Sequence, residues 1–179
     1  MIGADGVTAS SEMLDASNTD KYSADQAKLY TQGDTTLDLA GGWSPSTGDS
    51  EPWIKLNFNQ AIRVSGIVTQ GREDDDQWVT CYYVQYGTDP DCNVMEYILN
   101  EPSSGPEDKK EFDANIDRNT LVQNWFNQEI TTCCIAIVPN TWHNGVGMRV
   151  DVLGCSEVPT ETPPVSTETS TTQETTPST

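Results

Sequence analysis

The chain has 179 residues and a net charge of −19, from 9 basic and 28 acidic side chains. Four of the acidic residues lie in residues 156–179, which contain no Lys or Arg, so residues 1–155 carry the remaining −15. A surface this negative repels phosphate backbones and argues against nucleic acid as a partner. The sequence has no run of about 20 apolar residues, so it predicts no membrane-spanning helix.

The first predicted elements are a short helical turn at residues 24–30 and a strand at residues 53–58. In the strand, Ile54, Leu56 and Phe58 alternate with polar residues. This period of two is typical of a strand with one buried face.

Three further strands are rich in β-branched or aromatic residues, and each ends at turn-forming residues. They comprise residues 62–69, 79–87 and 135–138. The last strand begins at Met148, and Val150 and Val152 share its inward face. Arg149 and Asp151 are predicted to point outward. Many short strands without interleaved helices favour an all-β antiparallel sandwich or barrel.

Eight short segments occur in a characteristic order along the chain. They are Thr8-Ala9-Ser10-Ser11, Gly42-Trp43-Ser44-Pro45, Trp53-Ile54-Lys55-Leu56, Val68-Thr69-Gln70-Gly71-Arg72, Trp78-Val79-Thr80, Asp117-Arg118-Asn119-Thr120, Ile137-Val138-Pro139-Asn140-Thr141-Trp142-His143-Asn144 and Met148-Arg149-Val150-Asp151-Val152-Leu153-Gly154-Cys155. On these segments, residues 5–155 resemble a discoidin domain, also called the coagulation factor V/VIII type C domain. The resemblance implies a distorted jelly-roll β-barrel or sandwich over residues 1–155.

The same resemblance implies that three loops at one end of the barrel form the ligand-binding surface. These loops are expected at residues 13–22, 37–42 and 72–77. The candidate ligand-binding residues on or beside them are Met13, Leu14, Tyr22, Leu37, Arg72 and Trp78.

Arg72 is the most specific of these candidates, because some discoidin relatives use an Arg at this place to contact ligand. Its planar guanidinium can bind a carboxylate through two hydrogen bonds or stack on a flat ring. An internal salt bridge to Glu73 or Asp74 is the alternative. Trp78 borders the third loop, and both a binding and a structural role stay open for it.

Three other tryptophans fall in family segments that look like core or loop-anchoring positions. They are Trp43, Trp53 and Trp142, and a structural role is expected for each.

Met13 and Leu14 are expected at the tip of the first loop. Exposed apolar residues at this place enter the bilayer in phospholipid-binding relatives, so a membrane phospholipid is the alternative ligand. Nearby acidic residues such as Asp15 and Asp20 disfavour an anionic bilayer and make a glycan or protein the preferred partner.

The third loop carries the carboxylates Asp74, Asp75 and Asp76, which supply the hard oxygen ligands that Ca²⁺ prefers. The spacing of an EF-hand loop is absent, so a solvated acidic loop is the other interpretation. No other metal ion and no organic cofactor is expected.

The five cysteines lack the short spacings of a zinc site and favour disulfides. Cys133 and Cys134 are adjacent in a predicted strand and therefore face opposite sides. One of them is expected to bond to Cys81 or Cys92. Discoidin domains commonly tie the final Cys to one near their start, but no early Cys is present, so Cys155 is free or its partner lies outside this sequence.

Residues 156–179 contain nine Thr, four Ser and four Pro and no aromatic residue. Such a stretch buries too little apolar surface to offset the entropy of ordering it, so we expect a disordered stalk or linker. Its composition is typical of O-glycosylated, mucin-like spacers, and an unmodified linker is the alternative.

The sequence offers no nucleophile elbow, metal-ligand cluster or phosphate-binding loop, so no enzymatic activity is expected. We expect an extracellular module, secreted or on a cell surface as part of a larger protein. It would mediate adhesion by binding a cell-surface or matrix glycan or protein through the three loops.

Overall fold

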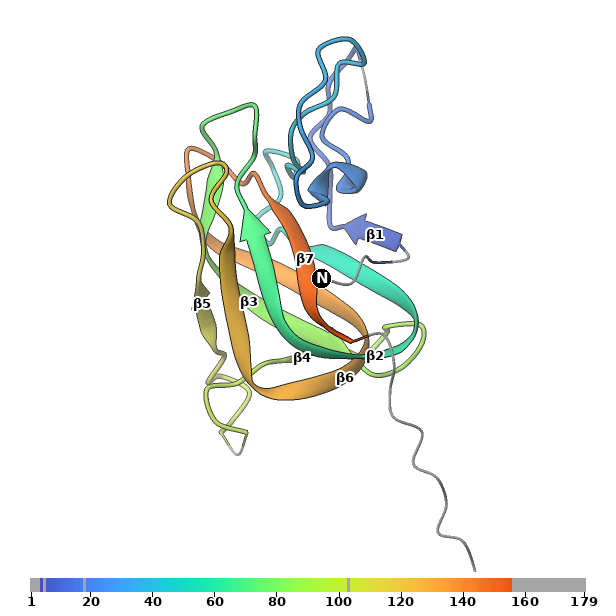
Figure 1. The fold of residues 1–179 in the computed structure, drawn as a ribbon, viewed down its shortest axis with the longest axis vertical. Helices are drawn as coiled ribbons and strands as arrows, with labels where there is room; N and C mark the ends of the chain where they lie inside the picture. The colour runs from blue at the N-terminus through green and yellow to red at the C-terminus, as the bar shows by residue number, and fades with distance from the viewer. Residues whose placement is uncertain (1–3, 5, 18, 103, 156–179) are drawn as a thin grey trace, which may run out of the picture.

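The computed structural model describes residues 4, 6–17, 19–102 and 104–155. Its elements are β1 (Gly6–Ala9), a 3₁₀ turn η1 (Ala24–Ala27), β2 (Ile54–Gln70), β3 (Trp78–Gly87), β4 (Glu96–Tyr97), β5 (Glu111–Asp113), β6 (Val122–His143) and β7 (Arg149–Cys155) (Figure 1). The expected all-β class is confirmed. In the described part of the chain, no helix has the length and apolar character that crossing a bilayer requires. The stalk predicted at residues 156–179 lies outside the described residues.

The named strands pair in the antiparallel order β1-β2-β6-β3-β4, with β7 added to β2 and β5 added to β3. β2 and β6 are 17 and 22 residues long. They pair with each other in three stretches, because the register breaks between Asn57 and Ile62 and again between Val64 and Gly66. Such irregularities bend a strand, and here they let both long strands curve around the core (Figure 1). The result is the distorted jelly-roll that the resemblance implied.

The core is built from the inward faces of these curved strands. Ile54, Leu56 and Phe58 of β2 are buried, and so are Val150 and Val152 of β7, as the alternation predicted. Each such side chain contributes roughly 1.5–3 kcal/mol when it is removed from water. One continuous cluster of these residues holds the strands and η1 together.

Arg149 corrects the prediction that it points outward, because it is only 2 % exposed. Loops cover this side of β7, and their polar groups satisfy the guanidinium. Nε donates to the carbonyl oxygen of Gly71 at 2.7 Å, and Nη1 donates to that of Thr31 at 2.8 Å. Nη2 donates to the carbonyl of Arg118 at 2.7 Å and to Oδ1 of Asn119 at 2.9 Å. Burial lowers the pKa of Arg149.

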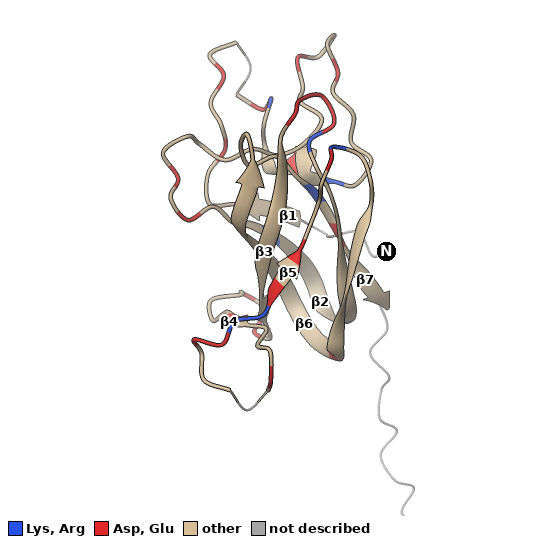
Figure 2. Cartoon of the chain, turned by 90° about the vertical axis from the view of Figure 1, so that its left-hand side faces the viewer, with Lys and Arg blue, Asp and Glu red and all other residues tan. Residues whose placement is uncertain are grey.

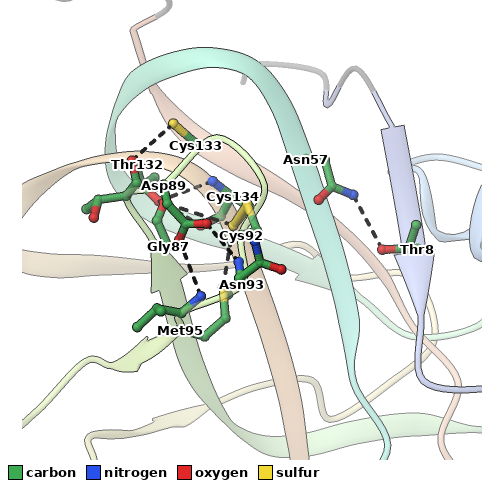
Figure 3. The surroundings of a disulfide bond; sticks show 12 residues. Thr8, Asn57, Gly87, Asp89, Cys92, Asn93, Met95, Thr132, Cys133 and Cys134 are labelled. Atoms are coloured by element: carbon green, nitrogen blue, oxygen red, sulfur yellow. Dashed lines mark hydrogen bonds between the residues drawn. A yellow bond between two sulfur atoms is a disulfide. The ribbon is translucent and has the colours of Figure 1, made fainter.

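A disulfide joins Cys92 to Cys134 (Figure 3), which confirms the prediction that one of the two adjacent cysteines bonds to Cys81 or Cys92. Because neighbouring strand residues face opposite sides, Cys133 lies away from the bond as a buried free thiol. Cys81 and the exposed Cys155 are also free. The bond holds the segment between β3 and β4 onto the end of the barrel opposite the predicted binding loops (Figures 1 and 3).

Candidate ligand-binding loops

The three predicted loops lie together at one end of the barrel (Figure 1). We call this surface the loop pole, and it consists of residues 13–22, 37–42 and 72–77. The backbone joins its parts directly. The N–H of Ala40 donates to the carbonyl of Lys21 at 2.9 Å, and the N–H of Glu73 donates to that of Gly41 at 2.9 Å. The second loop therefore links the first loop to the third.

Arg72 begins the third loop, and its guanidinium is bound within that loop. Nε lies 2.7 Å from Oδ1 of Asp74, and Nη2 lies 2.9 Å from Oδ2 of the same carboxylate. Nη1 donates to Oε1 of Gln77 at 3.1 Å. The guanidinium carbon lies over the ring of Tyr22, 4.8 Å from its centroid. With a side chain only 7 % exposed, Arg72 occupies the interior of the loop pole and not its surface.

Asp74 extends this network to the second loop, because the N–H of Gly41 donates to its Oδ1 at 2.8 Å. Burial raises the pKa of Asp74, but the hydrogen bonds from Arg72 and Gly41 outweigh burial and leave that pKa below its usual range. The carboxylate is thus ionised and fully used in holding the two loops together. Of the two internal partners considered for Arg72, the structure selects Asp74.

Lys21 plays the corresponding part in the first loop. Its ammonium lies 2.8 Å from the carboxylate of Asp38 and 3.3 Å from that of Asp15. Hydrogen bonds from Ser17, followed by Lys21, lower the pKa of Asp15 to about 2. Sequence reasoning did not single out Lys21, although it is the only basic residue before Lys28 and has acidic residues on both sides.

The apolar candidates differ in their exposure. Leu14 is 80 % exposed and Leu37 is 63 % exposed, so both present their side chains to solvent. Met13 is half-buried, and its N–H donates to the carbonyl of Ser44 at 2.8 Å. It lines a cavity of about 230 Å³ together with Trp142 and neighbouring loop residues. The structure therefore places two of the three apolar candidates where a ligand can reach them.

Trp78 stacks on His143, with ring centroids 4.1 Å apart and planes inclined by 12°. His143 ends β6, and its Nε2 lies 3.4 Å from Oδ2 of Asp76. The amide of Asn144 also donates to the carbonyl of Asp76 at 3.1 Å. These contacts tie the third loop to the turn between β6 and β7, and Trp78 is half-buried within them.

The three aspartates of the proposed Ca²⁺ site each lie beside a basic side chain. Asp74 pairs with Arg72, Asp75 lies 3.6 Å from Nη1 of the same arginine, and Asp76 contacts His143. Within residues 4, 6–17, 19–102 and 104–155, no group of three or more His, Cys, Asp or Glu side chains is arranged to hold a metal ion. The role of Asp74, Asp75 and Asp76 as Ca²⁺ ligands stays a prediction.

The tryptophans expected to be structural are not alike. Trp43 is fully buried, and its indole N–H donates to the carbonyl of Ser11 at 3.0 Å, as a loop-anchoring residue requires. Trp53 is half-buried. Trp142 is 45 % exposed, so it is not a core residue. Its strand, β6, extends beyond the core at this point and presents the indole to solvent.

Acidic positions recur along the loops at this end of the barrel, with few basic positions between them (Figure 2). The two basic residues at the loop pole, Lys21 and Arg72, are both engaged by aspartates. The accessible surface therefore combines exposed leucines with carboxylates and backbone polar groups. Such a surface can bind a ligand by apolar contact and hydrogen bonding.

The family model of the F5/8 type C domain matches residues 6–152. The chain belongs to this family. The match covers nearly all of the described residues.

Among curated proteins, the chain is similar to retinoschisin of Takifugu rubripes, with 32 % identity over 161 residues, covering 86 % of this chain and 54 % of that protein. It is also 32 % identical over 151 residues to lactadherin of Rattus norvegicus, covering 83 % of this chain and 33 % of that protein. The chain thus spans about half of the first relative's length and a third of the second's.

Among solved structures, the wild-type discoidin II of Dictyostelium discoideum superposes with a TM-score of 0.68 at 26 % identity, covering 82 % of this chain and 53 % of that one. A module from Clostridium perfringens in complex with GalNAc-β-1,3-galactose superposes with a TM-score of 0.58 at 15 % identity, covering 81 % of this chain and 88 % of that one, and shows that the fold is shared.

Proposed function

We propose that this domain is a non-enzymatic recognition module that mediates cell or matrix adhesion by binding a glycan or protein ligand at the loop pole. One observation carries the proposal: the Lys21–Asp38 ion pair and the hydrogen bonds between Gly41, Glu73 and Asp74 join the three loops, while Leu14 and Leu37 stay exposed. A surface that is already rigid loses little entropy when it binds, which favours affinity.

In this proposal Arg72 is a positioning residue. Its guanidinium is saturated by Asp74, Gln77 and Tyr22, so it acts on a ligand through the shape of the third loop. Leu14 and Leu37 provide the apolar contacts, and Trp78 supports the third loop from the side of β6.

An oxidising, extracellular location fits this role. The Cys92–Cys134 disulfide is typical of secreted and surface proteins. Membership in a family that includes retinoschisin and lactadherin supports the same assignment.

The loop pole is tested by comparing the wild type with the double variant Leu14→Ser/Leu37→Ser on a glycan array and on immobilised matrix proteins. We expect the variant to lose about tenfold or more in affinity, because two exposed apolar contacts are removed. Val94→Ser is the matched control, since Val94 is 66 % exposed and lies beyond the opposite end of β3. Binding by the double variant at wild-type strength would place the site elsewhere.

The second candidate is peripheral attachment to phospholipid membranes, and the exposure of Leu14 and Leu37 is the observation that favours it. Burying two such side chains gives roughly 3–5 kcal/mol, whereas the surrounding carboxylates oppose an anionic surface. Sedimentation with phosphatidylserine and phosphatidylcholine vesicles, with Ca²⁺ and with EDTA, separates the candidates. Protein that stays in the supernatant under all four conditions excludes the membrane alternative, and binding that needs Ca²⁺ would support the aspartates as ligands.

A further inference from the structure

A groove of about 540 Å³ lies on the outer face of the sheet formed by β2, β6, β3 and β4. Its walls combine aromatic rings with a cation and an amide. They include Trp53, Tyr83, Tyr97, Lys109, Asn140 and Trp142. None of the groove's lining residues belongs to the loop pole, although Trp142 also lines the cavity beside Met13.

The register of the strands explains why the sheet is hollow here. Tyr83 of β3 pairs with Val138 of β6. Trp53 immediately precedes Ile54, which pairs with Ile137, so Trp53 lies on the other side of Val138. Neighbouring strands are about 4.8 Å apart, which separates the two aromatic positions by about 10 Å. A short valine between two large rings leaves a trough, and this trough is wide enough for a sugar ring.

The aromatic rings of the groove are accessible. Trp142 is 45 % exposed, and Trp53, Tyr83 and Tyr97 are half-buried. Tyr83 and Tyr97 meet edge to face, with centroids 6.2 Å apart, which fixes both rings. Flat rings that are held in place and partly exposed provide the apolar faces on which the C–H faces of sugars pack.

The polar groups of the groove are also held in place. Asn140 donates to the hydroxyl of Tyr83 at 3.3 Å and to the carboxylate of Glu111. Its carbonyl oxygen and the tyrosine hydroxyl therefore keep fixed directions in which they can meet the hydroxyl groups of a ligand. Glu51 lines the groove as a further hydrogen-bond acceptor.

Lys109 is the basic residue that lines the groove, together with the acidic Glu51, and Lys55 lies beside the groove on the ring of Trp53. Lys109 lies 4.1 Å from the ring centroid of Tyr97 and 6.0 Å from that of Tyr83. Lys55 lies 5.7 Å from the centroid of Trp53. Neither lysine forms a salt bridge with a carboxylate anywhere in the part of the chain that the structure describes. The basic segment before β5 lies beside β4 (Figure 2), where a bridge between Leu99 and Lys109 holds it.

We propose that the groove is a second ligand site, which binds an oligosaccharide that carries carboxylate or sulfate groups. The sugar rings pack against Trp53 and Trp142, and the anionic group lies at Lys109. The ammonium of Lys109 lies on the rings of Tyr83 and Tyr97 inside the groove and forms no salt bridge among the described residues, so it can meet the anionic group of such a ligand.

The test is titration calorimetry of the full chain with four probes: tetragalacturonate, a heparin tetrasaccharide, neutral cellotetraose and a tetraglutamate peptide. We expect one of the two acidic oligosaccharides to bind at least about tenfold more tightly than cellotetraose and tetraglutamate. The first two probes separate carboxylate from sulfate as the recognised group. Equal binding of cellotetraose would overturn the role of Lys109, equal binding of tetraglutamate would overturn the role of the sugar, and binding of neither acidic oligosaccharide would overturn the site.

Variants then locate the binding. Lys109→Gln and Trp142→Ala are each expected to weaken the acidic oligosaccharide by about tenfold, whereas Lys28→Gln, at an exposed lysine paired with Asp25, leaves binding unchanged. Trp142→Phe is the milder second variant, because it keeps an aromatic ring at position 142. Thermal unfolding checks that each variant is folded. Loss of binding in Leu14→Ser/Leu37→Ser, with no change in Lys109→Gln, would place the same ligand at the loop pole and overturn the proposal for the groove.

Discussion

Arg72 and Arg149 are both buried, but different groups satisfy them. Arg149 has carbonyl and amide oxygens around its guanidinium, whereas Arg72 has the carboxylate of Asp74. An arginine held by carbonyls keeps its charge and fixes loops from the inside, and Arg149 does so for three backbone segments. A buried arginine held by one carboxylate depends on that partner, because removing it leaves an uncompensated charge.

Asp74→Asn tests this dependence. The change removes the charge that compensates Arg72, and we expect a loss of about 2 kcal/mol in the free energy of unfolding. Asp75→Asn is the matched control, because Asp75 is 51 % exposed and 3.6 Å from the guanidinium; exposed pairs of this kind contribute about 0–1 kcal/mol. Urea denaturation of both variants gives the comparison, and equal losses would contradict the assigned role of Asp74.

Arg149→Met tests the second arrangement. The methionine fills part of the volume but leaves the carbonyls of Gly71, Thr31 and Arg118 without their donor. We expect a loss of about 3–5 kcal/mol. Urea denaturation measures it, and a loss below about 1 kcal/mol would mean that water replaces the guanidinium at no cost.

The sequence predicted both candidate roles for Arg72 and could not choose between them. The choice depends on the turn at residues 72–77, which places Asp74 and not Glu73 against the guanidinium. The outward orientation of Arg149 was predicted wrongly for a related reason. Alternation along β7 sets which side a residue faces, but only tertiary structure decides whether loops cover that side.

Among the strands, β6 shows where the sequence pattern stops predicting a strand. The sequence predicted only residues 135–138, where the strand is apolar and buried on both faces. Residues 122–131 alternate in burial but are mostly polar, and Trp125 on their outer face is 60 % exposed. This part of β6 forms because it pairs with β2, which is a long-range contact that local sequence does not encode.

The disulfide is the clearest energetic link between elements, since Cys134 of β6 bonds to Cys92 across 42 residues of sequence. In the chain-entropy model, closing a loop of this length stabilises the fold by about 4 kcal/mol. We expect Cys92→Ser/Cys134→Ser to lose stability of this order in denaturant titrations without reductant. Cys155→Ser, at an exposed free thiol, is the control and should unfold as the wild type does.

For the whole molecule, the arrangement of the loops was predicted through the resemblance to discoidin domains, because spacing alone does not bring residues 13–22, 37–42 and 72–77 together. The side groove was not predicted, since its residues come from β3, β4, β6 and the segments before β2 and β5, and they meet only through the pairing of these strands. The loop pole and the side groove both lie on a barrel whose acidic residues mostly accept hydrogen bonds. The stability of the fold therefore depends on pH.

Among the residues that the structure describes, eight aspartates have a pKa below the usual value, including Asp74 and Asp117. A carboxyl of this kind stabilises the fold above its unfolded pKa of about 3.9, and this contribution is lost as the pH falls through the folded value. We expect the free energy of unfolding to decrease below about pH 4 in urea titrations. Constant stability from pH 6 to pH 2.5 would contradict this.

The pKa of Asp151 shifts in the opposite direction to the pKa values of those eight aspartates. Burial raises it, even though the N–H of Val152 donates to the carboxylate at 2.7 Å. Such a group binds its proton more tightly in the folded state, so its favourable contribution is present below the unfolded pKa and is lost as the pH rises through the folded value. Asp151→Asn removes the cost of burying the charge. The residue is only half-buried, so solvent screening limits the gain at pH 7 to about 0.5–1 kcal/mol. At pH 3 the variant should unfold at the same urea concentration as the wild type, and a gain of equal size at both pH values would show that the effect does not come from the charge.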